Sequence, residues 1–357
     1  MAEETAGQES LAAVFRRLIA NYGPISLQQY MGESNARYYS GKDPLGGAGD
    51  FVTAPEISQM FGELIGLWLT DIWMRAGAPA MVHYVELGPG RGTLARDALR
   101  VMRRQGLNPQ VHLVEGSEAL RAEQRKVVPE AQWHDDMDSL PTDGVLLLVG
   151  NEFLDALPVR QMVKTAAGWR ERMVGLEGHR FVPVAGDRPM DAAVPEAWLD
   201  APEQTLIETC PGAAAVVDEI ARRLESQGGA ALLIDYGYAQ KRTGSTLQAI
   251  RAHTKVDPFA HPGEADLTCL VDFATMAEVA VAGGARHLGT APQGAFLRAL
   301  GIETRAAQLC SVAPQQSSAI NSDKDRLIDE GQMGQLFKVM GLAAQGWPDG
   351  AGFGAGV

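Results

Sequence analysis

The chain contains 357 residues, 46% of them hydrophobic and 21% charged, so it can bury a substantial core. Its 31 basic and 44 acidic residues give a net charge of −13, which disfavours binding to nucleic acid backbones and anionic membranes. Three widely spaced cysteines exclude a disulfide framework and a clustered thiolate zinc site. The acidic start of the chain and its short apolar runs predict a cytoplasmic protein without membrane insertion.

The first stretch, residues 1–80, predicts a helical part. Helices are expected at residues 11–20 and from residue 25, and a glycine-rich loop follows them at residues 40–50. Thr53 and Glu56 form an S/T-x-x-E pattern, which predicts that Thr53 caps a helix continuing to residue 72. The loop before this helix is interpreted either as a lid over a site or as a plain surface loop.

The second stretch, residues 81–240, alternates short apolar runs with helical segments, which is the pattern of βαβ units. Three short alternating segments interrupt it near residues 159–184 and predict an inserted β-meander. The third stretch, residues 241–357, predicts a substrate-side elaboration with a frayed end from residue 347. Its expected helices lie near residues 272–282, 293–300 and 325–340. The fold class is therefore α/β, a Rossmann-like, mostly parallel sheet flanked by helices.

A glycine turn joins a predicted strand to a predicted helix. Its glycines are Gly88, Gly90 and Gly92, and they follow the apolar run at residues 81–87. Glycine lets the backbone bend sharply and lets a ligand approach without meeting a Cβ atom. The next predicted strand leads to Glu115, where doubly wound folds place an acid that binds ribose hydroxyls. The expected ligand is a nucleoside-containing cofactor, and the alternative is an ordinary strand-to-helix turn without a ligand.

Two nucleoside cofactors fit this turn differently. A dinucleotide fingerprint requires glycine where the chain has Thr93, so the pyrophosphate site is poorly matched. Glu86 supplies a carboxylate that suits a cationic amino-acid group and is unfavourable beside a pyrophosphate. The segment resembles the acid-x-Gly-x-Gly-x-Gly motif that opens class I methyltransferases. This resemblance favours S-adenosylmethionine over a dinucleotide.

An acidic stretch follows the third predicted strand. Class I methyltransferases often place an acid here that binds the adenine amino group, and the next residue covers the ring. We assign these roles to Asp136 and Met137, with Asp135 as the alternative acid. A solvated acidic loop is the competing interpretation. The seven histidines show no metal-ligand spacing, so no metal site is expected.

Several separated motifs are similar to those of the MidA family. They lie at residues 38–40, 49–58, 86–93, 150–160, 234–238, 244–250 and 266–268. The motifs follow the family's order and cover most of the chain. Eukaryotic members are mitochondrial protein arginine methyltransferases that act as complex I assembly factors, and this chain resembles a bacterial relative of them.

The resemblance implies a class I methyltransferase fold and a protein partner. The implied reaction is symmetric dimethylation of an arginine in the quinone-proximal subunit of respiratory complex I. Two alternatives stay open, namely a small-molecule methyltransferase and a cofactor-binding assembly chaperone without essential turnover. The β-meander and the large carboxy-terminal stretch favour a macromolecular substrate, because they add surface around the site.

Three polar residues after the fourth predicted strand are the catalytic candidates. A guanidinium has a pKa above about 12, so the enzyme must orient its nitrogen and help to remove a proton. Glu152 stands where a carboxylate can pair with a guanidinium in a bidentate manner. We assign Asn151 to the donor or a substrate amide, and Asp155 is the reserve carboxylate.

The same residues have a structural interpretation, in which Asn151 caps a helix and Glu152 meets its amino-terminal dipole. The better-known arginine methyltransferases carry two glutamates after this strand, whereas only Glu152 is evident here. Asp235 and Tyr236 end a later central strand and are expected to line the substrate side.

Overall fold

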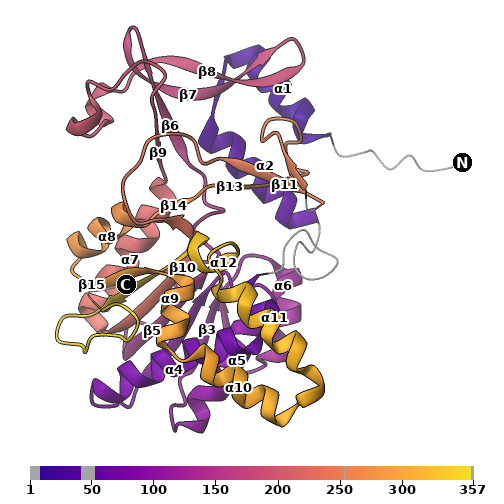
Figure 1. Ribbon diagram of the computed structural model, residues 1–357. Coiled ribbons are helices and arrows are strands. Elements are labelled where there is room, and N and C mark those ends of the chain that lie inside the picture. The colour runs from indigo at the N-terminus through magenta and orange to yellow at the C-terminus, as the bar shows by residue number, and fades with distance from the viewer. Residues whose placement is uncertain (1–8, 42–52, 253, 355–357) are drawn as a thin grey trace, which may run out of the picture. The chain divides into compact units, whose positions relative to one another are not determined.

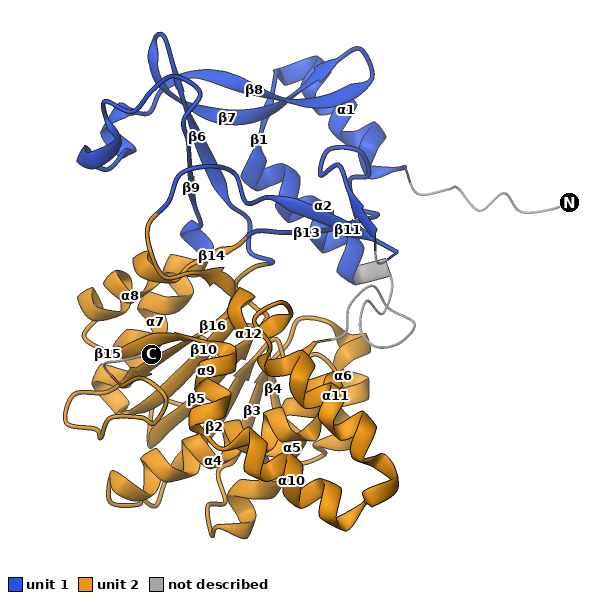
Figure 2. Ribbon diagram, in the orientation of Figure 1, with its two compact units in different colours: residues 1–42, 156–212, 242–269 blue, residues 43–155, 213–241, 270–357 orange. Residues whose placement is uncertain are grey.

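The computed structural model of the protein describes residues 9–41, 53–252 and 254–354. The chain divides into two compact units, each assembled from three separate stretches (Figure 2). The ranges of unit 1 are 1–42, 156–212 and 242–269, and those of unit 2 are 43–155, 213–241 and 270–357. Among the described residues, no helix has both the length and the apolar character that a bilayer crossing demands.

These units do not follow the three consecutive stretches expected from the sequence. The expected boundary at residue 80 falls inside unit 2, whereas the one at residue 240 lies beside an observed change of unit. The β-meander belongs to unit 1 together with the amino-terminal helices. Most of the carboxy-terminal stretch belongs to unit 2, because three of its strands, β14, β15 and β16, belong to the large sheet.

The large sheet of unit 2 has the strand order β15-β16-β10-β5-β2-β3-β4, with β14 paired to β10 (Figure 1). The strands are β2 (Val82–Leu87), β3 (Gln110–Val114), β4 (Gln132–His134), β5 (Val145–Asn151), β10 (Gly229–Tyr238), β14 (Val271–Asp272), β15 (Arg286–Pro292) and β16 (Phe337–Ala343). The run from β10 to β4 is parallel, whereas β16 is antiparallel to both of its neighbours. The expected α/β class with a mostly parallel sheet is confirmed.

Helices cover both faces of this sheet (Figure 1). They are α3 (Ala54–Ile57), α4 (Gln59–Arg75), α5 (Thr93–Arg104), α6 (Glu118–Val127), α7 (Pro211–Gln227), α8 (Phe273–Ala282), α9 (Gln293–Ala299), α10 (Ile302–Val312), α11 (Ser317–Ile328) and α12 (Met333–Leu336), with the 3-10 turn η3 (Pro314–Gln316). Helices α4, α5, α9, α10 and α11 share one apolar cluster with alternate residues of the strands, such as Leu147 and Val149. Helices α7 and α8 lie on the opposite face. Central strands buried on both faces explain the continuous apolar runs in the sequence.

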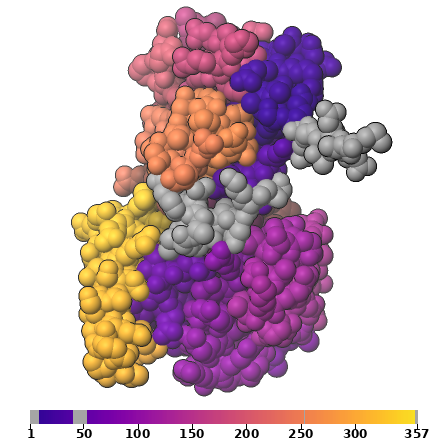
Figure 3. Space-filling model, turned by 90° about the vertical axis from the view of Figure 1, so that its right-hand side faces the viewer, coloured from indigo at the N-terminus to yellow at the C-terminus, as the bar shows by residue number. Residues whose placement is uncertain are grey.

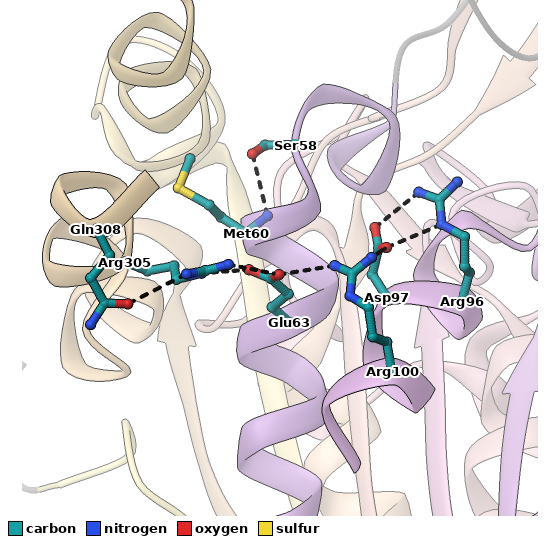
Figure 4. A network of polar contacts seen from close by, with 8 residues as sticks. All are labelled: Ser58, Met60, Glu63, Arg96, Asp97, Arg100, Arg305 and Gln308. Atoms are coloured by element: carbon teal, nitrogen blue, oxygen red, sulfur yellow. Dashed lines mark hydrogen bonds and ion pairs between the residues drawn. The ribbon is translucent and has the colours of Figure 1, made fainter. Parts of the chain in front are cut away.

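Helices α4 and α5 approach each other closely. A Cβ atom at Gly66 would lie 2.6 Å from the carbonyl oxygen of Ala98, so only glycine fits there. Beside this contact, the buried Glu63 accepts hydrogen bonds from Arg100 (2.9 Å) on α5 and from Arg305 (2.7 Å) on α10 (Figure 4). The pairing offsets the cost of burying the Glu63 carboxylate and connects three helices. Figure 3 shows the carboxy-terminal segment, in yellow, beside the indigo and violet residues that include α4.

Three local expectations are wrong in unit 2. Residues 325–340 were expected to form one helix, but α11 ends at residue 328 and residues 337–343 form β16. Thr53 stands at the N-cap of α3, but its side chain makes no capping hydrogen bond. The helix does not continue to residue 72, because α3 ends at Ile57 and the Ser58 hydroxyl accepts the Met60 N–H at the start of α4. The end from residue 347 packs rather than frays as far as residue 354, because Trp68 donates a hydrogen bond to the Ala351 carbonyl oxygen (3.0 Å).

The described part of unit 1 contains two small antiparallel sheets, two helices and two 3-10 turns. One sheet runs β1-β7-β6-β9 with β8 paired to β7, and the other runs β12-β11-β13. The strands are β1 (Ile25–Ser26), β6 (Arg160–Thr165), β7 (Gly168–Glu177), β8 (Arg180–Pro189), β9 (Leu206–Thr209), β11 (Gln248–Arg251), β12 (Thr254–Val256) and β13 (Asp266–Thr268). The helices are α1 (Leu11–Tyr22) and α2 (Leu27–Gly41), and the turns are η1 (Asp191–Ala193) and η2 (Glu196–Trp198). Strands β6, β7 and β8 are the β-meander expected from the sequence.

Two apolar clusters stabilise unit 1 on opposite faces of its larger sheet. Phe15 of α1 and Tyr30 of α2 pack with Val174 and Phe181 on one face. The other face carries a smaller cluster around Trp169 of β7, which includes residues of η1 and η2. Alternation along β7 explains why Val174 and Trp169 point to different sides.

Candidate active site

A cavity of about 440 Å³ lies within unit 2 where β2 and β3 end. Its lining comes from the glycine turn, from the residues after β3, β4 and β5, and from α7. These residues are Leu87, Gly88, Val114, Glu115, Gly116, Asp135, Asp136, Met137, Asp138, Phe153, Ala215, Val216 and Glu219. Parallel α/β sheets bind ligands at the carboxyl ends of their strands, and this cavity has that position.

The glycine turn has the backbone conformation that requires glycine. Gly88, Gly90 and Gly92 have φ values of 59°, 54° and 79°. A Cβ atom at Gly88 would lie 2.8 Å from the ring of Phe153, so a side chain there would displace a wall of the cavity. Of the three, Gly88 lines the cavity, whereas Gly92 begins α5. The turn therefore brings backbone, rather than side chains, to the ligand.

Two other residues assigned to this turn have their side chains in contacts within the protein. Thr93 donates its hydroxyl hydrogen to Glu56 of α3. Glu86 is buried and accepts a hydrogen bond from the Tyr84 hydroxyl (2.5 Å). Burial raises the pKa of Glu86 to about 8, although the Tyr84 hydrogen bond opposes the shift. Neither residue is among those lining the cavity, and their roles in cofactor binding stay predictions.

Glu115 lies at the cavity and is held there by its neighbours. Its carboxylate accepts hydrogen bonds from the Ser117 N–H (2.8 Å) and from Gln124 Nε2 (3.3 Å). Burial raises the pKa of Glu115, while these two hydrogen bonds lower it. Gln124 also donates to the Gly90 carbonyl oxygen (2.7 Å), so the acid and the glycine turn share one support. This fixed carboxylate is suited to receive ribose hydroxyls.

The acidic stretch after β4 forms another wall of the cavity. Asp135, Asp136 and Met137 all line it. Asp135 forms an ion pair with Arg121 (2.6 Å), whereas Asp136 accepts the backbone N–H of Asp138 (3.0 Å). The competing assignments of the adenine acid to Asp135 and Asp136 both remain compatible with this placement.

The chain after β5 makes a turn instead of entering a helix, so the capping interpretation of Asn151 is wrong. Glu152 has a φ of 50°, a conformation that costs energy for a residue with a side chain. Its carboxylate accepts hydrogen bonds from the Ala54 N–H (3.2 Å), from Asn151 (3.2 Å) and from the Tyr236 hydroxyl (3.3 Å). Burial raises the pKa of Glu152, and the three donors oppose the shift. Asn151 Oδ1 is buried and has no hydrogen-bond partner in the described part of the chain.

Asp235 supports this turn from the neighbouring strand. One of its oxygens accepts the backbone N–H groups of Phe153 (3.1 Å), Leu154 (2.9 Å) and Asp155 (3.2 Å). Burial, and then the charge of Glu152, raise the pKa of Asp235. The expectation that Asp235 lines the substrate side is wrong, because its side chain is buried and binds this backbone. Asp155 is also buried, and Tyr236 contacts Glu152.

Sequence reasoning did not assign several of the lining residues to the site. Among them, Phe153 provides a ring beside the glycine turn, and α7 contributes Ala215, Val216 and Glu219. Phe153 follows directly from Glu152, so its position could have been inferred from the same strand end. The α7 residues follow a strand of unit 1 rather than a strand of the large sheet, and no local pattern marks them.

Comparisons with known proteins identify the family. The model of a family of S-adenosyl-L-methionine-dependent methyltransferases matches residues 64–291. This chain belongs to that family. The match confirms the resemblance to MidA proteins and the cofactor S-adenosylmethionine. Two features of the cavity fit this cofactor, namely the Glu115 carboxylate and the turn at Gly88, which has no side chain.

Similar sequences support the same family. The methyltransferase is 36% identical to the mitochondrial protein arginine methyltransferase NDUFAF7 of Xenopus tropicalis, over 92% of this chain and 84% of that protein. It is 34% identical to the human protein of that name, over 91% of this chain and 81% of that protein. These relatives are named mitochondrial, so the expectation of a cytoplasmic protein is wrong. Acidic composition near residue 1 does not determine a compartment.

A solved structure shares the whole architecture. It is a protein from Burkholderia thailandensis bound to S-adenosyl-homocysteine, with 31% sequence identity and a TM-score of 0.82. The similarity covers 97% of this methyltransferase and 92% of that chain. S-adenosyl-homocysteine is what remains of the donor after methyl transfer, which agrees with the assigned cofactor.

Proposed function

We propose that this methyltransferase transfers methyl groups to an arginine side chain of a protein, and that the protein is a subunit of respiratory complex I. The names of the curated relatives support the arginine substrate. The observation that carries the proposal is the Glu152 carboxylate, held by three donors at the end of β5 and directly before Phe153, which lines the donor cavity.

The Glu152 carboxylate orients the substrate. It can pair with two N–H groups of a guanidinium and concentrate positive charge on them, which leaves the third nitrogen better able to attack. S-adenosylmethionine supplies an electrophilic methyl group when it is bound. A strained backbone and three hydrogen bonds fix Glu152, and fixed geometry reduces the barrier for group transfer.

The same carboxylate can take up the proton that the methylated nitrogen loses. A general base is more effective when its pKa approaches the working pH, and burial raises the pKa of Glu152 in that direction. Tyr236 donates to the outer oxygen of this group and stabilises its charged form. Asn151 Oδ1, which has no hydrogen-bond partner among the described residues, can accept an N–H from the bound donor or substrate.

The decisive test is the Glu152→Gln variant. Turnover should fall by roughly 10²–10⁴-fold because orientation and proton transfer are lost together, whereas donor affinity by calorimetry should change little. A matched control is Glu118→Gln, an exposed acid on α6 that does not line the cavity. Normal turnover in Glu152→Gln would show that this carboxylate has no role in the reaction.

The substrate is tested by labelled methyl transfer into a lysate of a strain that lacks the gene. Mass spectrometry should find the label on arginine in the quinone-proximal subunit of complex I, as symmetric dimethylarginine. A labelled metabolite would identify a small-molecule methyltransferase instead. Donor binding without any label would identify an assembly chaperone that uses the cofactor only as a ligand.

A further inference from the structure

A second cavity, of about 350 Å³, lies within unit 1 and is separate from the residues of the donor cavity. Strands β6, β7, β8 and β9 provide most of its lining. Val163, Pro183, Ala185 and Leu206 give it an apolar floor, and Arg172 is its charged lining residue. The proposed function assigns no role to it.

The cavity is the uncovered half of a sheet face. Arg172 and Val174 of β7 lie on the same face, because they are two residues apart, and they pair with Ala185 and Pro183 of β8. Around Val174, helices α1 and α2 cover this face with aromatic side chains. At Arg172, two residues before Val174 on the same strand, this face borders the cavity and not the helices. The apolar residues of the cavity thus lie partly exposed on the sheet face whose other part is covered by the core of unit 1.

No carboxylate of the described residues forms an ion pair with Arg172. Its guanidinium donates to Gln161 Oε1 (2.6 Å). Neighbouring arginines of the same sheet differ, since Arg160 pairs with Glu171 (3.0 Å). Gln161 is fully buried, and its Nε2 donates to Glu208 (2.6 Å) and to the Ser245 hydroxyl (2.7 Å). These hydrogen bonds fix the orientation of its amide, so that Oε1 faces Arg172.

The charge of Glu208 acts on Arg172, but the hydrogen bonds of the Glu208 carboxylate come from neutral groups. Glu208 accepts hydrogen bonds from Gln161 and from the hydroxyl and backbone N–H of Thr246. Burial lowers the pKa of Arg172, and the charge of Glu208 opposes the shift. A guanidinium stays protonated in spite of such a shift, so a half-buried cation borders the cavity. Gln204, at the same cavity, has a φ of 69°, a strained conformation of the kind found at binding sites.

We propose that this cavity binds the side-chain carboxylate of an aspartate or glutamate that is flanked by apolar residues in the protein substrate. Arg172 takes the carboxylate in a bidentate pair, and the apolar floor takes the flanking side chains. This inference rests on the proposed function, because it assumes a protein substrate. If a protein substrate binds in this way, unit 1 recognises the residues around the substrate arginine. Arg172 then supplies a cationic binding site in a chain whose net charge is acidic.

The test uses arginine side-chain NMR of the full chain, which needs no methyl transfer. The Arg172 Nε–H signal is assigned by its loss in Arg172→Lys. The probe is the acetylated heptapeptide Gly-Val-Leu-Glu-Val-Leu-Gly, and its glutamine twin is the control. The glutamate peptide should shift the Arg172 signal until the shift saturates. Its affinity should be at least roughly tenfold higher than that of the peptide with glutamine in place of glutamate. Signals of the exposed Arg188, on the same sheet, should not move.

Three results would overturn the proposal: no shift at Arg172, equal shifts with both peptides, or an equal shift with acetate at the same concentration. A shift with inorganic phosphate but not with the glutamate peptide would also overturn it, since the site would then be a phosphate site. Once a substrate is known, Arg172→Gln should raise KM about tenfold and leave kcat unchanged, whereas Arg188→Gln changes neither. Failure of the proposed function would instead appear as absent arginine methylation in the wild-type enzyme.

Discussion

The donor cavity of unit 2 and the second cavity of unit 1 are similar in size and opposite in charge. Glu115, Asp135 and Asp136 line the first, whereas Arg172 is the charged residue lining the second. Arg121 and backbone N–H groups bind the acids of the first cavity, whereas Arg172 donates to an amide and forms no ion pair with the residues that the structure describes. The comparison shows that a net charge of −13 describes neither site. Local charge and its partners determine the ligand.

The largest expected effect is that of Asp235→Ala, which should disturb the donor cavity and leave the second cavity intact. In Asp235→Ala, three backbone N–H groups of the turn around Phe153 lose their acceptor. The free energy of unfolding should fall by about 3 kcal/mol or more, and turnover should fall roughly 10²-fold because Glu152 is displaced. Denaturant unfolding and methyl-transfer rates measure this. If peptide binding at Arg172 weakens as much as donor binding, the two cavities are not independent.

A smaller effect, on donor affinity, is expected from replacing Glu115, the acid assigned to the ribose hydroxyls. Glu115→Ala removes charge-assisted hydrogen bonds worth roughly 1.5–3 kcal/mol each, so calorimetry should show donor affinity falling at least tenfold. Glu118→Ala, an exposed acid three residues away that lies outside the lining, is the control. Unchanged affinity in Glu115→Ala would remove this residue from the cofactor site. Binding of the glutamate peptide should be the same in both variants.

A pH dependence of stability is expected from three histidines of the large sheet. His83, His112 and His134 form a hydrogen-bonded row across β2, β3 and β4, with 3.0 Å between the ring nitrogens of successive residues. Burial lowers the pKa of His112 to about 4, from an unfolded value near 6.5. Because the folded pKa is the lower one, the stabilisation is present above pH 6.5 and lost as pH falls toward 4. The loss should be roughly 1–2 kcal/mol after allowance for solvent screening.

The matched variant for this pH effect is His112→Leu. Its unfolding free energy should change less than that of the wild type between pH 6.5 and 4. Equal slopes in the two proteins would mean that the row does not titrate in this window.

The smallest effect concerns salt. The Debye length falls from about 10 Å at 0.1 M to about 3 Å at 1 M, so the half-buried pair at Arg172 should be partly screened. We expect glutamate-peptide affinity to fall roughly threefold over this range, and donor affinity to change less because its hydrogen bonds are short-ranged. Salt titrations by NMR and calorimetry compare the two. A stronger salt effect on the donor would reverse the contrast between the cavities.

Local patterns predicted the parallel half of the sheet well. Apolar runs alternating with helical segments located β2, β3, β5 and β10, and strand ends located Glu115 and Glu152. The donor turn was recognisable because positive φ values at Gly88 and Gly92 require a residue type that is visible in sequence.

Features that depend on distant partners were not predictable in this way. The apolar run of β16 is buried on both faces, so its pattern does not distinguish strand from helix. Glu56 matched a capping pattern, but its carboxylate binds Thr93, far along the chain. Asp235 resembled a substrate ligand because it ends a strand, whereas its partners are backbone N–H groups of another strand's turn. Tertiary contacts determined these outcomes.

The position of β16 has a consequence for synthesis on the ribosome. β16 lies between β10 and β15, although the residues from β11 to α12 separate it from β10 in the chain. The edge of β10 that pairs with β16 therefore stays open during synthesis until residues 337–343 have been made. An open edge is a template for pairing with other chains, so the nascent enzyme is exposed to aggregation during this interval. Chains that terminate before residue 337 lack β16 and retain that open edge.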